Sequence, residues 1–375
     1  MIPGLVDARS SLFLSEADLS GSGAADQGVL DAADLFRDEA AKVLAQGVTT
    51  LYLSPGSRGA VCGVGAVVKL RNTAAGSGEV RARVLAPTAA LDLTIGLSAN
   101  GRSTSLERLN SYEALRSLFK SAEQYEKSFE RYNRDLKAYE KLPPAPKPAP
   151  GASPSASPPA QKPARPKRVP AQETVLSAIK GTIPVRIEAH RVDDILNALR
   201  LAEEFHLKAV LVSATESRSL AGEIARRAIP VIWGPTLDGS PRLETREHRP
   251  ETAADLARAG VKLALTPNSR SGLGSRFLRE NAALAVSYGL TADQALRAIT
   301  LDAARALGVA DRVGSIEPGK DADLVVLSTP AFDGSSRVER VFVDGQEVVP
   351  ARALVSEHRA AARQASSKGG RALDE

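Results

Sequence analysis

The chain has 375 residues, of which 43% are hydrophobic and 25% charged, a composition typical of a globular protein with one large domain or two ordinary ones. It contains no run of about 18 apolar residues and only one cysteine, Cys62, so we expect no membrane partner, no disulfide framework and no thiolate-rich metal site. The net charge of +5 has a local source, because residues 141–172 hold six Lys or Arg and no acidic residue, and we therefore expect no nucleic-acid partner for the folded part.

Short apolar strands alternate with helices along most of the chain. The first strand is predicted at residues 49–53, after a helix-like stretch at 31–46 that ends before Gly47. Further strands are predicted at 185–189, 209–212, 230–233 and 263–265, and helices at 193–205, 217–227 and 253–259. Apolar strands alternating with helices indicate an α/β fold with a parallel sheet covered on both faces. At this length the pattern favours a barrel over an open doubly wound sheet, although periodicity alone does not separate them.

A glycine-rich stretch at residues 55–65 follows the first of these strands. It lacks the Gly-Lys-Ser/Thr ending of a phosphate-binding loop, and no helix start follows it plainly. We therefore expect a loop at the mouth of the barrel rather than a nucleotide site.

A long helical insert is predicted at residues 112–140. Its apolar residues recur every three or four positions, at Leu115, Phe119, Ala122, Tyr125, Phe129, Tyr132, Leu136 and Tyr139. This spacing suits a helix packed on the barrel and also a two-helix seam between chains. Residues 141–172 contain 11 of the 23 prolines and few apolar residues, so we expect a disordered loop that is either a solvated tether or a binder of acidic partners.

The C-terminal part is predicted to form a small β unit at residues 312–350. Strands are expected at 322–327, 338–343 and 347–349, with Asp344 and Gly345 in the last turn. Residues 351–375 are expected to form a tail that is helical to about 365 and frayed beyond.

Four stretches in order along residues 1–349 share a sequence pattern with a known family. They are residues 2–8, 188–195, 284–307 and 314–324, and the last, Gly-Ser-Ile-Glu-Pro-Gly-Lys-Asp-Ala-Asp-Leu, is highly specific in this context. Together they resemble the amidohydrolase superfamily, in its imidazolonepropionase-like branch. The resemblance implies a (β/α)8 TIM-type barrel over residues 1–311 and β-sandwich strands over 312–350.

The resemblance also bears on the start of the chain. The family has several strands ahead of the Pro-Gly-Leu motif, here residues 3–5, and these complete its β-sandwich. Because the chain begins at this motif, we expect an incomplete sandwich whose exposed edges a partner chain could cover. Residues 1–4 lack the basic and apolar segments of a signal peptide, which leaves the localisation unknown.

The resemblance implies one or two divalent metals, such as Zn²⁺, at the C-terminal mouth of the barrel, where they activate water for hydrolysis. The family's ligand positions fall on Arg9, Ser11, His190 and Ser213, and its catalytic aspartate falls on Asn268. Only His190 is an ordinary metal ligand, and a guanidinium at Arg9 would repel a cation. We therefore expect no metal cofactor and a pseudoenzyme.

Three functions remain open from the sequence. In the first, the chain is a catalytically impaired scaffold or partner subunit, in a homo-oligomer or with an active paralogue. Its mouth residues Arg9, Ser11, Glu188, His190 and Ser213 would then either bind a small anionic ligand or retain an Arg9–Glu188 pair as a vestige. In the second, it hydrolyses carbon–nitrogen (non-peptide) bonds through a reduced site around His190. In the third, the basic loop binds polyanions.

Overall fold

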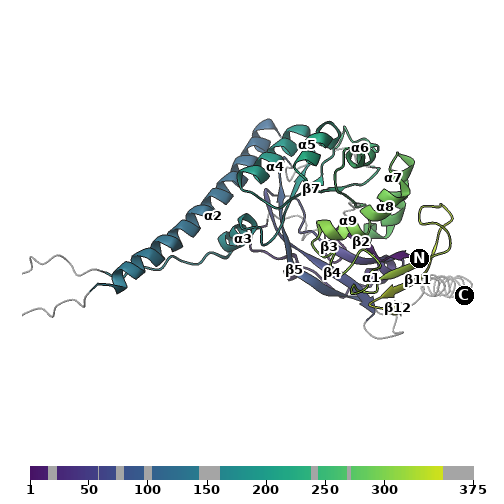
Figure 1. Cartoon of the computed structure of the whole chain (residues 1–375), viewed down its shortest axis with the longest axis horizontal. Helices are drawn as coiled ribbons and strands as arrows, with labels where there is room; N and C mark the ends of the chain where they lie inside the picture. Colours follow the sequence, from purple (N-terminus) through teal and green to yellow (C-terminus); the bar gives the residue numbers. More distant parts are fainter. Residues whose placement is uncertain are drawn as a thin grey trace, which may run out of the picture.

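The computed structural model describes residues 1–15, 23–57, 59–72, 80–96, 104–142, 161–237, 244–267 and 272–348. At its centre is an eight-stranded sheet (Figure 1). The strands follow one another in chain order: β2 (Leu5–Ser10), β3 (Val48–Leu53), β4 (Val61–Asn72), β5 (Val80–Thr94), β6 (Val185–Ala189), β7 (Ala209–Ser213), β8 (Val231–Trp233) and β9 (Leu263–Leu265). The predicted strands around residues 49, 185, 209, 230 and 263 are therefore present.

One strand runs against the others. β4 pairs in antiparallel fashion with both β3 and β5, whereas the remaining neighbours are parallel. The prediction of a wholly parallel sheet is wrong here, and so is the loop predicted at residues 63–65, which belong to β4. A side chain at Gly65 would overlap the ring of Tyr52, so the glycine marks a close approach of two strands rather than a loop.

The seam between β2 and β9 is bridged by side chains and by the connection between two helices. The amide of Val6 donates to the carbonyl of Ile299 at 2.8 Å. The hydroxyl of Thr266, just past β9, donates to a carboxylate oxygen of Asp7 at 2.8 Å. The sheet is therefore nearly closed, and Ala304 and Leu307 join its inward-facing apolar residues as a plug.

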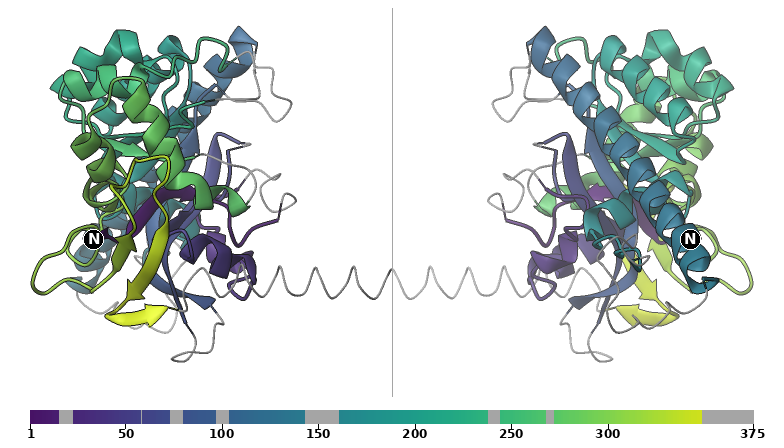
Figure 2. Two further views of the ribbon diagram at one scale, coloured as in Figure 1. Left: turned by 90° about the vertical axis from the view of Figure 1, so that its right-hand side faces the viewer. Right: turned by 90° about the vertical axis from the view of Figure 1, so that its left-hand side faces the viewer.

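Helices cover the outer face of the sheet, except that α9 packs against its inward-facing residues. Their bounds are α1 (Glu39–Leu44), α4 (Val192–Glu204), α5 (Ala221–Arg226), α6 (Thr252–Arg258), α7 (Leu278–Ser287), α8 (Ala292–Ala298) and α9 (Leu301–Ala306), with 3₁₀ turns η2 (Val29–Asp31), η3 (Ser217–Leu220) and η4 (Gly272–Phe277). In α4 the buried residues Ile195, Leu199 and Ala202 form one stripe, as its periodicity predicted. In Figure 2 the teal helices lie at the top of the molecule and the yellow C-terminal strands at the bottom.

The predicted insert is helix α2 (Ser105–Glu140), which begins at a capping box formed by Thr104 and Glu107. Its first half packs on the body, where Phe119 stacks on Phe205 with ring centroids 5.0 Å apart. Its second half projects away from the sheet (Figure 1). Helix α3 (Pro170–Ile179) begins inside the segment predicted to be a disordered loop, with its proline in the first turn. Residues 143–160 of that segment lie outside the described part.

The three C-terminal strands and a short N-terminal strand form a separate four-stranded antiparallel sheet. Its order is β1 (Ile2–Pro3), β10 (Leu324–Leu327), β11 (Val338–Val343) and β12 (Gln346–Val348). The fully buried ammonium of Lys69, on β4, lies 2.7 Å from Asp321 and 2.9 Å from Asp323 and also contacts Asp344. These contacts attach the small sheet to the large one. The predicted tail, 351–375, lies outside the described residues.

None of the helices described is long and apolar enough to span a membrane.

Candidate functional site

An irregularity in β2 helps to direct Arg9 towards the interior of the large sheet. The pairing of β2 with β3 places both Ala8 and Arg9 opposite Tyr52 alone. Such a bulge adds one residue to a strand and re-aims the side chains around it. Arg9 consequently reaches across to β6, which is not a neighbour of β2 in the sheet.

Arg9 forms a two-pronged ion pair with Glu188. The Nη1 and Nη2 atoms of Arg9 donate to Oε1 and Oε2 of Glu188 at 2.9 and 2.7 Å. Ser213, at the end of β7, accepts from Nη1 at 3.0 Å and donates to Oε1 of Glu188 at 3.1 Å. Ser213 and Ala214 both have positive φ, at +67° and +44°, so the chain turns sharply at this point.

His190 completes this group, which we call the Arg9–Glu188 cluster. Its Nε2 lies 3.3 Å from Oε1 of Glu188, and its Nδ1 lies 2.7 Å from the hydroxyl of Thr215. The cluster thus joins Arg9, Glu188, His190, Ser213 and Thr215 from three strands. Four of the five ligand-binding residues predicted from the sequence lie in it. Ser11 is buried just past β2, and Asn268 lies outside the described residues.

Both charges of the ion pair persist although they are buried. The side chains of Arg9 and Glu188 are only 13% and 10% exposed. Burial alone would raise the pKa of Glu188, but Arg9 and His190 outweigh it and hold that pKa well below its usual range. Burial would lower the pKa of Arg9, yet Glu188 raises it above the ordinary value. Arg9 and Glu188 therefore form an ionised pair within the cluster, and their opposite charges balance each other.

A second polar layer lies deeper in the sheet and was missed by the sequence analysis. Asp92 on β5 accepts from the hydroxyls of Tyr52 at 2.7 Å and Ser54 at 2.9 Å, and Arg186 on β6 approaches it to 3.2 Å. Arg186 also lies 3.6 Å over the ring of Tyr52. Burial raises the pKa of Asp92, and Arg186 opposes that rise. Arg186 itself could have indicated this layer from the sequence. It is a charged residue two positions before Glu188 in the same strand, so the two side chains lie on the same face of the sheet.

Cys62 lies near this layer, with its sulfur 3.3 Å from the hydroxyl of Thr94. Burial raises the pKa of its thiol to about 12. The thiol is protonated at neutral pH, so Cys62 is not a nucleophile there.

The side chains of the cluster are a poor fit for a divalent cation. Across the described ranges, no three His, Cys, Asp or Glu side chains are grouped so that they could hold a metal ion. The only carboxylate of the cluster, Glu188, is bound by a guanidinium that cannot lose its proton. Both ring nitrogens of His190 already contact neighbours.

Comparisons with known proteins identify the family. The family model for the amidohydrolases matches residues 182–348. The fold also superposes on an amidohydrolase from Thermotoga maritima with a TM-score of 0.76 and 30% identity, over 93% of this chain and 86% of that one. The chain belongs to the amidohydrolase family. The predicted resemblance is thereby confirmed, and with it a TIM-type barrel that departs from the regular form at β4.

Sequence relatives indicate the branch of the family. The chain is 32% identical to an imidazolonepropionase from Mesorhizobium japonicum over 147 residues, which are 38% of this chain and 34% of that protein. A shorter stretch of 51 residues is 53% identical to an imidazolonepropionase from Porphyromonas gingivalis. The matched region spans about a third or less of these relatives. They place this amidohydrolase in the imidazolonepropionase-like branch.

Proposed function

We propose that this amidohydrolase-family protein has exchanged its family's metal site for the Arg9–Glu188 ion pair and acts as a non-hydrolytic partner or binding subunit. One observation carries the proposal: both prongs of the Arg9 guanidinium are bound to Glu188 inside the barrel. A divalent cation beside this guanidinium would meet a fixed positive charge at low dielectric.

The same geometry argues against acid–base chemistry by the cluster. A general acid or base works best when its pKa lies near the working pH. The pKa of Glu188 is held far below that range by Arg9 and His190, against the effect of burial. Glu188 is therefore a permanent counterion to Arg9 rather than a group that exchanges protons.

The geometry also argues against anion binding at Arg9. Nη1 and Nη2 of Arg9 already donate to Glu188 and Ser213. An anion at this position would have to displace a carboxylate from a buried ion pair, which is costly. The partner is either a second copy of this chain or an active relative. Light scattering after gel filtration, alone and with such a relative, tests this: a monomer that binds neither would contradict the partner role.

An activity assay separates this proposal from hydrolysis at a reduced site around His190. The substrate is imidazolonepropionate, taken from the name of the relatives, with Zn²⁺ or Mn²⁺ supplied. The wild-type protein and His190→Ala should both show only the uncatalysed rate. Turnover by the wild type that His190→Ala abolishes would contradict the proposal and support a carbon–nitrogen hydrolase.

A further inference from the structure

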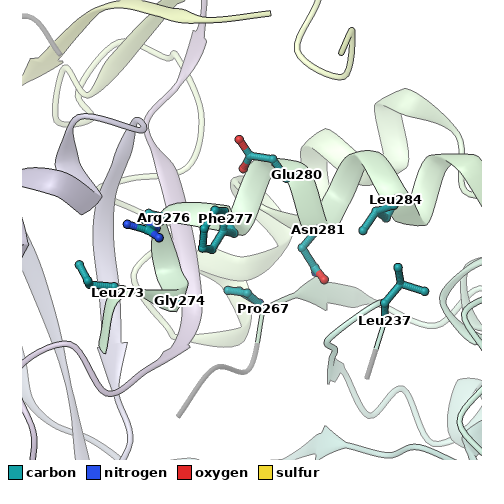
Figure 3. Close-up of a pocket in the computed structure, with 9 residues that line it drawn as sticks. All are labelled: Leu237, Pro267, Leu273, Gly274, Arg276, Phe277, Glu280, Asn281 and Leu284. Carbon is teal, nitrogen blue, oxygen red and sulfur yellow. The ribbon is translucent and has the colours of Figure 1, made fainter. Parts of the chain in front are cut away.

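A pocket of about 440 Å³ opens beside the C-terminal ends of β8 and β9 (Figure 3). Its wall is built from η4 and α7 together with Leu237 and Pro267, which follow the two strands. The volume lies in the range of sites that hold small organic molecules. The pocket shares no residue with the Arg9–Glu188 cluster.

Arg276 is a charged wall residue without a counterion among the described residues. Among the described residues, its guanidinium lies over the ring of Phe277, with Cζ of Arg276 4.4 Å from the ring centroid. The Nε atom of Arg276 is buried and has no hydrogen-bond partner. This differs from Arg9, whose Nη1 and Nη2 atoms both donate to a carboxylate and whose Nη1 also donates to a hydroxyl. Within the described residues, the guanidinium of Arg276 therefore has no acceptor that an anion would have to displace.

The other polar wall residues are already engaged. The amide of Asn281 accepts from the backbone of Thr236 at 2.8 Å and donates to the carbonyl of Thr266 at 3.2 Å. The carboxylate of Glu280 lies 3.5 Å from the guanidinium of Arg279. Among the described wall residues the pocket consequently offers one guanidinium without a counterion, while its one carboxylate, Glu280, is 49% exposed and paired with Arg279.

The rest of the wall is apolar and partly open to water. Leu237, Phe277 and Leu284 are 51%, 49% and 37% exposed, and they are among the large hydrophobic side chains that the fold leaves uncovered. In Figure 3, Leu237 and Leu284 lie at one end of the pocket and Arg276 at the other, with Pro267 and Phe277 between them. A ligand with an apolar tail would remove this surface from water.

We propose that this pocket binds a small carboxylate with an apolar tail. The two carboxylate oxygens accept hydrogen bonds from the guanidinium of Arg276. The apolar tail lies along Pro267 and Phe277 and ends near Leu237 and Leu284. A single guanidinium matches a single carboxylate in charge and geometry. The inference is independent of the proposed loss of hydrolysis, because it concerns other residues.

The test uses the full chain and three probes: hexanoate, the uncharged hexanol, and acetate, which lacks the tail. Binding is measured by ligand-observed NMR titration. Hexanoate should bind about tenfold more tightly than either of the other probes, as expected for one charge-assisted contact and a buried tail. Arg276→Gln should weaken hexanoate binding about tenfold and leave hexanol unchanged.

Arg200→Gln is the matched control, because Arg200 is an exposed arginine on α4, and it should leave all three affinities unchanged. Leu284→Ser, which shortens the apolar end, should weaken hexanoate more than acetate. Thermal unfolding of each variant checks that the fold is kept. Equal hexanoate affinity in the wild type and Arg276→Gln would overturn the proposal, and so would no binding at about 10 mM.

Discussion

Replacing Glu188 by Gln keeps the shape of the side chain but removes the charge that balances Arg9. Losing one member of a buried ion pair costs about 3–5 kcal/mol, because the other charge stays out of water. Gln can still accept a hydrogen bond from Arg9, so we expect the lower end, about 3 kcal/mol. With about 2.1 cal/mol/K of unfolding entropy per residue over 375 residues, this corresponds to a fall in Tm of about 4 °C. Urea and thermal unfolding measure both quantities.

The chain supplies a control with the same geometry on the surface. Arg340 binds Glu347 with two contacts of 2.8 and 2.7 Å, but these side chains are 53% and 38% exposed. Glu347→Gln should cost less than about 1 kcal/mol. The double variant Arg9→Met with Glu188→Met, which removes both charges, should be more stable than Glu188→Gln alone. Equal costs for Glu188→Gln and Glu347→Gln would refute the reasoning.

Acidity adds a further check on the ion pair. The pKa of Glu188 is lowered in the folded state by Arg9 and His190 against the opposing effect of burial, from an ordinary value of 4.5. Ionised Glu188 therefore contributes its full stabilisation of the fold when the pH is above that ordinary value, and this stabilisation is lost as the pH falls below it. The difference in stability between the wild type and Glu188→Gln should shrink once the pH drops below about 4.5.

Two further predictions concern other buried charges. Burial and Asp193 raise the pKa of Asp194 from 3.8 to about 6, so its ionisation destabilises the folded state as the pH rises through that interval. Chemical unfolding should therefore show that the stability advantage of Asp194→Asn over the wild type grows by up to about 3 kcal/mol from pH 4 to pH 8, with a smaller growth for Asp193→Asn. An advantage that does not change with pH would contradict this. Lys69→Met should leave Asp321 and Asp323 without their counterion, lower the free energy of unfolding by about 3–5 kcal/mol and speed amide hydrogen exchange in β10 and β11. Arg83→Gln is the control, because Arg83 contacts the same aspartate cluster but is 36% exposed, and it should have little effect. Equal amide exchange in the two variants would contradict the role of Lys69.

The strands from β6 to β9 could be predicted because each is a short apolar run followed by a helical repeat. β4 and β5 could not, because the glycines of β4 suggest a loop and the pairing of β4 with β5 connects residues that local patterns do not relate. Gly65 is the clearest case: it is set in a strand by its contact with Tyr52, a neighbour that only the folded structure provides.

The candidate site was predictable in composition but only partly in arrangement. Family resemblance placed Arg9, His190 and Ser213 at one mouth, and the structure brings them together around Glu188. The bulge at Arg9 is set by the pairing of β2 with β3, which no local pattern reveals. The pocket at Arg276 depends on how η4 and α7 lie against the ends of two strands, so residue types alone gave no sign of it.

Zinc competition against a chromogenic chelator tests the central claim most directly, namely that an ion pair stands in place of a metal site. The wild-type chain should not withdraw zinc from the chelator, whereas the double variant Arg9→His with Ser11→His should begin to do so, because it restores imidazole ligands and removes the positive charge. Stoichiometric zinc uptake by the wild-type protein, abolished in His190→Ala, would contradict the account.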